Sequence, residues 1–230
     1  MKGFCGSVLT ALVLAGMISA PGSGQTIRSP YRFIDHSQAG GPFAGYIFTT
    51  EGTVGLAPKG GPIAGGRYGI RLSGPFLVEG EVGYFTSTRP VRDTVVVDSV
   101  RQQVGSADFS MLLATAALRF NFTGPRTWHG LQPYVQLGGG AAIDLSGESP
   151  DDEKVAADVR YDFGTSFAGH LGGGIEWYPS DRITFRVDAR NVLWKITTPI
   201  SFLQGELGET TPVDEWVQNG FLTLGIALHF

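Results

Sequence analysis

The feature that most constrains this chain is the alternation of apolar and polar residues along nearly all of it after residue 38. Eight segments alternate with a period of two and are bounded by Gly, Pro, Asn or Asp, a pattern typical of β-strands. They span residues 40–51, 63–73, 76–86, 109–123, 132–145, 166–178, 183–196 and 219–230. The sequence therefore predicts an all-β protein of about eight strands.

The lengths of the connections alternate as well. Residues 74–75 and 179–182 form tight turns, whereas residues 87–108, 146–165 and 197–218 form long connections. Transmembrane β-barrels have short turns on the periplasmic side and long loops outside, and backbone amides in lipid must all be paired. We therefore expect a single closed antiparallel up-and-down transmembrane β-barrel, with the long connections on the cell surface.

The N-terminal residues have the pattern of an export signal. Lys2 is the only charged residue before Arg28, and an apolar run over residues 8–20 is followed by small residues at 21–24. This run is too short for a membrane-spanning helix, which needs about 20 residues. We expect a cleaved secretory signal peptide at 1–24, which removes Cys5, then an irregular periplasmic segment at 25–38 and the barrel at 39–230.

The last strand has one continuous apolar face that ends at the C-terminal residue. This face consists of Leu222, Leu224, Ile226, Leu228 and Phe230. The pattern resembles the C-terminal assembly signal of outer-membrane barrels. Together with the glycine-rich strands, it makes residues 40–230 similar to the small OmpA-type outer-membrane β-barrel family. The resemblance implies localisation in the outer membrane of a Gram-negative cell. It also implies insertion by the barrel assembly machinery and contact with outer-membrane lipid and lipopolysaccharide, but no reaction and no cofactor.

The same phase predicts uncharged, lipid-facing sets on the other strands. These sets are Tyr68, Ile70 and Leu72; Phe76, Val78, Val82 and Tyr84; Leu112, Ala114, Leu118, Phe120 and Phe122; Val135, Leu137 and Ile143; Phe167, Leu171, Ile175 and Trp177; and Phe185, Val187, Ala189 and Leu193. Asn191 interrupts the last of these sets, so we expect either a bulge or a position near the membrane interface there. Segment 40–51 is apolar on both sides and is left unphased.

Aromatic residues near the strand ends are expected to mark the membrane interfaces. These residues are Trp128, Trp177, Tyr178 and Trp194.

The residues that alternate with these lipid-facing sets should point into the lumen, and several of them are charged. They are Arg67, Arg71, Glu79, Glu81, Arg119, Glu176, Arg186, Asp188 and Arg190, with Tyr134, Gln136 and His170 as polar neighbours. We expect Arg67 and Arg71 to pair with Glu79 and Glu81, and Glu176 to pair with Arg186 and Arg190, because isolated buried charges are costly. An eight-stranded barrel is narrow enough for such a network to fill. The alternative is a narrow, water-filled diffusion channel.

Other functions find little support in the sequence. The formal net charge of −4 argues against nucleic acid as a partner. His36, His129, His170 and His229 form no plausible Ser-His-acid set in this topology, so we expect no catalytic residues and no enzyme. The acidic loop residues match no metal-site spacing, and no metal or cofactor is expected. A lipid A-modifying enzyme and a lipocalin-like exported binding barrel are the lesser alternatives. A monomer is expected, and the sequence does not specify a ligand of the outer loops.

Overall fold

The computed structural model describes residues 29–97, 100–204 and 211–230, so the predicted signal peptide lies outside the described residues. The strands are β1 (Tyr31–Phe33), β2 (Gln38–Phe48), β3 (Gly61–Ser73), β4 (Phe76–Val97), β5 (Val100–Asn121), β6 (Arg126–Trp128), β7 (Leu131–Asp144), β8 (Thr165–Trp177), β9 (Ile183–Thr197) and β10 (Asp214–His229). Two 3₁₀ turns, η2 (Asp152–Lys154) and η3 (Ile200–Leu203), lie in connections. No helix in the described part of the chain is long and apolar enough to cross a membrane.

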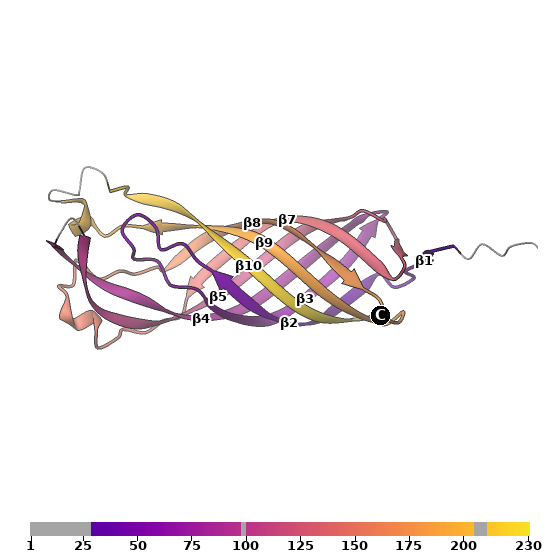
Figure 1. Cartoon of the computed structure of the whole chain (residues 1–230), viewed down its shortest axis with the longest axis horizontal. Helices are drawn as coiled ribbons and strands as arrows, with labels where there is room; N and C mark the ends of the chain where they lie inside the picture. Colours follow the sequence, from indigo (N-terminus) through magenta and orange to yellow (C-terminus); the bar gives the residue numbers. More distant parts are fainter. Residues whose placement is uncertain (1–28, 98–99, 205–210) are drawn as a thin grey trace, which may run out of the picture.

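Eight of these strands form a closed antiparallel ring. Each strand pairs with its neighbour in the order β2, β3, β4, β5, β7, β8, β9 and β10, and β10 pairs back with β2. Figure 1 shows the ring as a long cylinder of tilted strands. The predicted all-β barrel of about eight strands is therefore confirmed.

The two ends of the cylinder differ. The connections 49–60 and 145–164 lie at one end, called here the loop end, together with residues 198–204 and 211–213 and the ends of β4 and β5 near Val97 and Val100 (Figure 1). The turn after β3, β6 with its flanking turns, and the C-terminal Phe230 lie at the other end, called here the turn end.

The outer face is apolar, as the phase of the last strand predicts. Leu137, Phe167, Leu171 and Leu224 are among the large apolar side chains exposed there. A lipocalin-like barrel would bury this face around a ligand and present the polar one, so the exposed apolar face argues against that alternative. The unphased β2 points Phe43 and Ile47 inward and Tyr46 and Phe48 outward.

Asn191 lies on this outer face without a bulge. The register of β9 is continuous with both neighbouring strands. The Asn191 amide donates a hydrogen bond to the Gln218 side chain at 3.3 Å. The bulge is therefore wrong, and the position near the interface stays a prediction; the exposed Trp216 lies on the same face just beyond Gln218.

The segment 87–108, predicted to be a loop, is mostly strand. Both β4 and β5 contain 22 residues and continue into this segment at the loop end. The β-branched residues at 94–97 favour strand, and inward-facing Val91 and Ala107 are buried in the core of the hairpin extension. The prediction of a loop was wrong because β4 and β5 continue to pair beyond the residues whose outer face is apolar.

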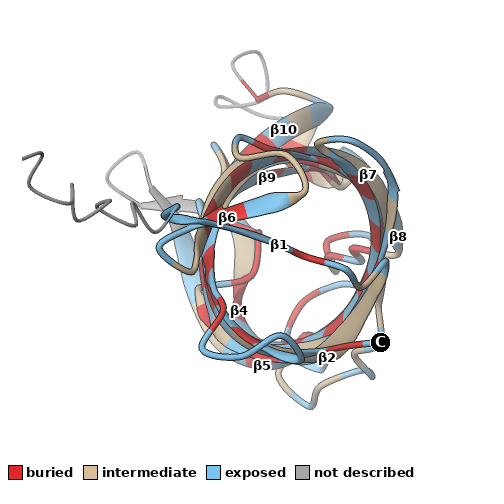
Figure 2. Cartoon of the chain, turned by 90° about the vertical axis from the view of Figure 1, so that its right-hand side faces the viewer, coloured by how far each residue is buried: buried red, intermediate tan, exposed pale blue. Residues whose placement is uncertain are grey.

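The segment before the barrel forms a strap across the turn end. Within the region predicted to be irregular, β1 pairs with β6. The Ile34 amide donates to the Pro125 carbonyl at 3.0 Å, and the Arg71 amide donates to the Ser37 carbonyl at 2.7 Å. Figure 2, which looks onto the turn end, shows this strap crossing the opening of the ring.

Candidate functional site: the lumen of the barrel

The inward-facing charges gather in a layer of the lumen nearer the turn end, called here the charged layer. Asp188 of β9 lies at its centre, with no part of its side chain exposed. Its carboxylate contacts Arg67 at 2.9 Å, Arg186 at 3.1 Å and Arg190 at 3.0 Å. The Thr223 hydroxyl donates to it at 2.9 Å. One carboxylate thus joins arginines from β3 and β9.

The two glutamates of β4 extend these contacts across the lumen. Glu81 contacts Arg190 at 2.8 Å and Arg67 at 3.4 Å. Glu79 contacts Arg186 at 2.5 Å and Arg119 at 3.8 Å. Because β4 and β9 are not neighbours in the ring, the contacts with Arg186 and Arg190 of β9 cross-link opposite walls.

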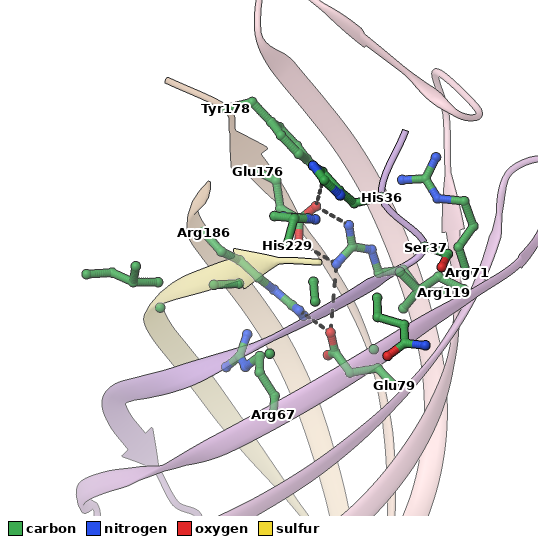
Figure 3. Close-up of a pocket in the computed structure, with 18 residues that line it drawn as sticks. His36, Ser37, Arg67, Arg71, Glu79, Arg119, Glu176, Tyr178, Arg186 and His229 are labelled. Atoms are coloured by element: carbon green, nitrogen blue, oxygen red, sulfur yellow. Dashed lines mark hydrogen bonds and ion pairs between the residues drawn. The ribbon is translucent and has the colours of Figure 1, made fainter. Parts of the chain in front are cut away.

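Glu176 of β8 completes the charged layer nearest the turn end. Both of its oxygens accept hydrogen bonds from Arg119, one of them at 2.6 Å, in a bidentate pair. The Tyr178 hydroxyl donates to the same carboxylate at 3.0 Å. Figure 3 shows Tyr178, Glu176, Arg119, Glu79 and Arg186 as one connected chain of contacts.

Aromatic faces pack against the same guanidinium groups. The Tyr134 ring lies between Arg119, at 3.9 Å from its centroid, and Arg186, at 4.7 Å. The Tyr134 hydroxyl accepts a hydrogen bond from Arg186 Nε. Gln136 accepts another from Arg186 at 3.1 Å. Cation–π contact adds to the ion pairs and fills the space between the charges.

The predicted pairings of Arg71 with Glu79 and Glu81, and of Glu176 with Arg186 and Arg190, are wrong. Arg71 forms no ion pair with any described residue, because it lies opposite Leu77 at the rim while Glu79 and Glu81 are held by other arginines. Glu176 lies opposite Arg186 in the β8–β9 ladder but pairs with Arg119. Arg186 instead forms ion pairs with Glu79 and Asp188 and donates a hydrogen bond to Tyr134. His170 is buried in the lumen, with no hydrogen-bond partner for Nε2 among the described residues.

The lumen toward the loop end is apolar, which the sequence analysis did not predict. Phe85, Phe109, Phe163 and Trp194 form a chain of edge-on aromatic contacts across it, with ring centroids 6.2, 5.8 and 6.2 Å apart. Trp194 is fully buried and Tyr178 nearly so, so their assignment to interfacial girdles was wrong. Trp128 and Trp177 are exposed near strand ends. The aromatic chain and the buried residues around it are called here the apolar plug.

The connections at the loop end fold inward and complete the apolar plug. Leu56 of connection 49–60, Val159 of connection 145–164 and Phe202 of η3 belong to the same buried cluster as the inward residues of the strands. This cluster could not be read from the strands alone, since these three side chains come from connections.

A buried ion pair fixes one of these connections. Arg89 of β4 contacts Asp152 of η2 at 2.7 Å, and both side chains are almost fully buried. Beside this pair, hydrogen bonds from the Lys154 ammonium and the Ser106 amide lower the pKa of Asp151. Connection 145–164 is thus held down onto the β4–β5 hairpin.

The space that remains in the charged layer is small. A cavity of about 30 Å³ lies between the strap and the charged layer, and His36, Ser37, Arg71, Tyr178 and His229 are among its lining residues (Figure 3). One or two waters need about this volume.

Comparisons with known proteins agree with this architecture. The outer membrane protein OprG from Pseudomonas aeruginosa aligns with a TM-score of 0.54 and 13% identity, over 88% of this chain and 99% of that chain. The N-terminal β-barrel domain of Pseudomonas aeruginosa OprF aligns at 0.46 and 13% identity (85% and 98% covered), and Neisserial surface protein A at 0.45 and 13% (88% and 98% covered). No family model and no curated protein matches the chain. The chain has the fold of the eight-stranded outer-membrane β-barrels.

In this outer-membrane fold, the predicted assembly residues lie on the outside of β10. Leu222, Leu224, Ile226, Leu228 and Phe230 are all exposed on the apolar face. Phe230 also exchanges two backbone hydrogen bonds with Gln38, at 3.0 and 3.3 Å. The terminal residue thus takes part in closing the barrel.

The described residues offer no metal centre. No group of three or more His, Cys, Asp or Glu side chains among them has an arrangement that could hold a metal ion. His229 shares a hydrogen bond of 3.1 Å with the Thr184 hydroxyl in the lumen. Of the acidic loop residues considered as metal ligands, Glu206 and Glu209 lie outside the described residues.

Proposed function

We propose that this protein is an outer-membrane barrel with a closed lumen, whose role is structural or is carried by interactions of its loop end at the cell surface. Residues 1–24 direct export and are then cleaved, and insertion depends on the β10 face and the barrel assembly machinery. The outer face then contacts outer-membrane lipid and, in the outer leaflet, lipopolysaccharide.

The observation that carries this proposal is that two different layers fill the lumen in series. The charged layer cross-links opposite walls near the turn end, and the apolar plug fills the loop end. An ion would have to displace paired charges from the first layer and enter an apolar region in the second, and each step is costly. This arrangement favours a closed barrel over the diffusion channel.

The experiment is a conductance measurement. Purified protein reconstituted in planar bilayers should give no steady current, because no continuous aqueous path joins the two faces. Reproducible open channels that change when Arg71 or Arg190 is replaced would favour the diffusion channel instead.

The interaction role belongs to the loop end because binding residues concentrate on loops over a rigid scaffold. The Arg89–Asp152 pair and the inward-packed connections give that end a defined shape. Deleting connection 145–164 while keeping the barrel, followed by a binding or adhesion screen, tests this assignment. An unchanged phenotype after removal of each loop in turn would favour a purely structural role.

A further inference from the structure

The charged layer contains one more arginine than carboxylate. Arg67, Arg71, Arg119, Arg186 and Arg190 face Glu79, Glu81, Glu176 and Asp188. The other four arginines form ion pairs with these four carboxylates. Arg71 is the remaining positive charge.

Arg71 is held where its charge is only partly hydrated. Its Nε and Nη1 atoms are buried and have no hydrogen-bond partner among the described residues. Figure 3 shows its guanidinium away from the connected carboxylates. Buried donors of a charged group are nearly always satisfied by a partner, and leaving them unsatisfied is costly.

The cavity under the strap supplies space for such a partner. Its walls include Arg71, Arg67, Arg119 and Arg186 but only two carboxylates, Glu79 and Glu176, and both are already held by Arg119. Ser37, His36 and His229 add a hydroxyl and two imidazoles to the same walls. The lining is therefore rich in hydrogen-bond donors and positively charged.

We propose that Arg71 is the centre of an anion-binding site at the turn end of the lumen, and that the site takes a monatomic anion such as chloride. The cavity of about 30 Å³ accepts a particle close to the size of water, and chloride and bromide are close to that size. The anion neutralises the surplus charge of the layer. This inference goes beyond the proposed function, and its failure would leave the closed lumen unaffected.

The direct test is crystallographic. Crystals of the full barrel grown with sodium bromide as the only halide salt should show an anomalous peak within hydrogen-bond distance of Arg71. A peak elsewhere only, or none, would overturn the proposal.

The second test measures stability in solution. At constant ionic strength, replacing gluconate by bromide should raise the unfolding midpoint of the unmodified protein by a saturable amount, as binding to the folded state requires. Arg71→Gln should abolish this dependence. Arg182→Gln, which removes an exposed arginine at the same end, should keep it. Because Arg71→Gln removes an unpaired charge, this variant should fold and be at least as stable in gluconate.

Two outcomes of this titration would contradict the proposal. If the Arg71→Gln variant responds to bromide as strongly as the unmodified protein, the effect does not arise at Arg71. If acetate or phosphate stabilises the protein as well as bromide does, the site is an oxyanion site and the assignment to a monatomic ion is wrong.

Discussion

At the scale of single residues, the charged layer depends most on Asp188. Its carboxylate contacts three arginines, and removing one partner of a buried pair leaves uncompensated charge. Asp188→Asn should therefore lower the free energy of unfolding by about 3 to 5 kcal/mol.

Asp181→Asn is the matched control. Asp181 also contacts an arginine, but its side chain is 74% exposed, and such pairs contribute about 0 to 1 kcal/mol. Urea titrations of both variants, followed by tryptophan fluorescence, measure the difference. Equal losses would show that burial of the pair is unimportant.

The direction of each inward side chain could be predicted from sequence, but its partner could not. Strand alternation places Arg119 and Glu176 in the lumen without any knowledge of the fold. Their pairing depends on the tilt of the strands and on which side chains meet across the lumen, and β5 and β8 are not neighbours. The partner of Glu176 therefore lies on a strand that is not a neighbour of β8.

At the scale of elements, the outer face of β10 must stay apolar. Leu224 lies near the middle of that face, so Leu224→Arg should destabilise the folded barrel by about 2 to 4 kcal/mol. Leu145→Arg, just past the end of β7 at the loop end, should cost about 0 to 1 kcal/mol because it lies near the interface. The fraction of heat-modifiable folded protein in the outer membrane provides the measurement. Deletion of Phe230 should reduce it as well, and unchanged levels would count against the assembly role of β10.

The Arg89–Asp152 pair should control how often connection 145–164 opens. Asp152→Asn leaves Arg89 without its charged partner, so the connection should detach more often and trypsin should cut after the exposed Lys154 more rapidly. Glu153→Gln changes a neighbouring exposed acid and should leave the rate unchanged. Equal rates in the two variants would show that the ion pair does not hold the connection.

The elements also show where sequence patterns stop being informative. The strand phase predicts the ring because one face must be apolar. The alternating connection lengths predict it because short turns lie at one end of such a barrel and long loops at the other. The continuation of β4 and β5 beyond residues 86 and 109 could not be predicted, because the outer face of this part of the hairpin is not apolar. The packing of Leu56, Val159 and Phe202 into the lumen was missed because connections have no period to read.

At the scale of the whole molecule, the orientation follows from the two unlike ends. The loop end should face the medium, so an epitope inserted after Gly147 should be labelled on intact cells. The same epitope inserted after Gly124, in the turn before β6, should be labelled only after lysis. The reverse result would show that the barrel has the opposite orientation in the membrane, with the proposed interaction surface in the periplasm.

The two layers of the lumen should each close it independently. Trp194→Ala removes the largest fully buried side chain of the apolar plug, at a cost of about 3 to 5 kcal/mol, and leaves the charged layer intact. Replacing Arg119 and Glu176 together by serine removes a charge pair without leaving either partner alone, and keeps the plug. We expect neither variant to conduct in planar bilayers, whereas the triple variant should show a steady current, because only then is each layer interrupted. Folding of all three is checked by heat modifiability. A steady current from Trp194→Ala alone would mean that the charged layer admits ions, and that the apolar plug is the only closure of the lumen.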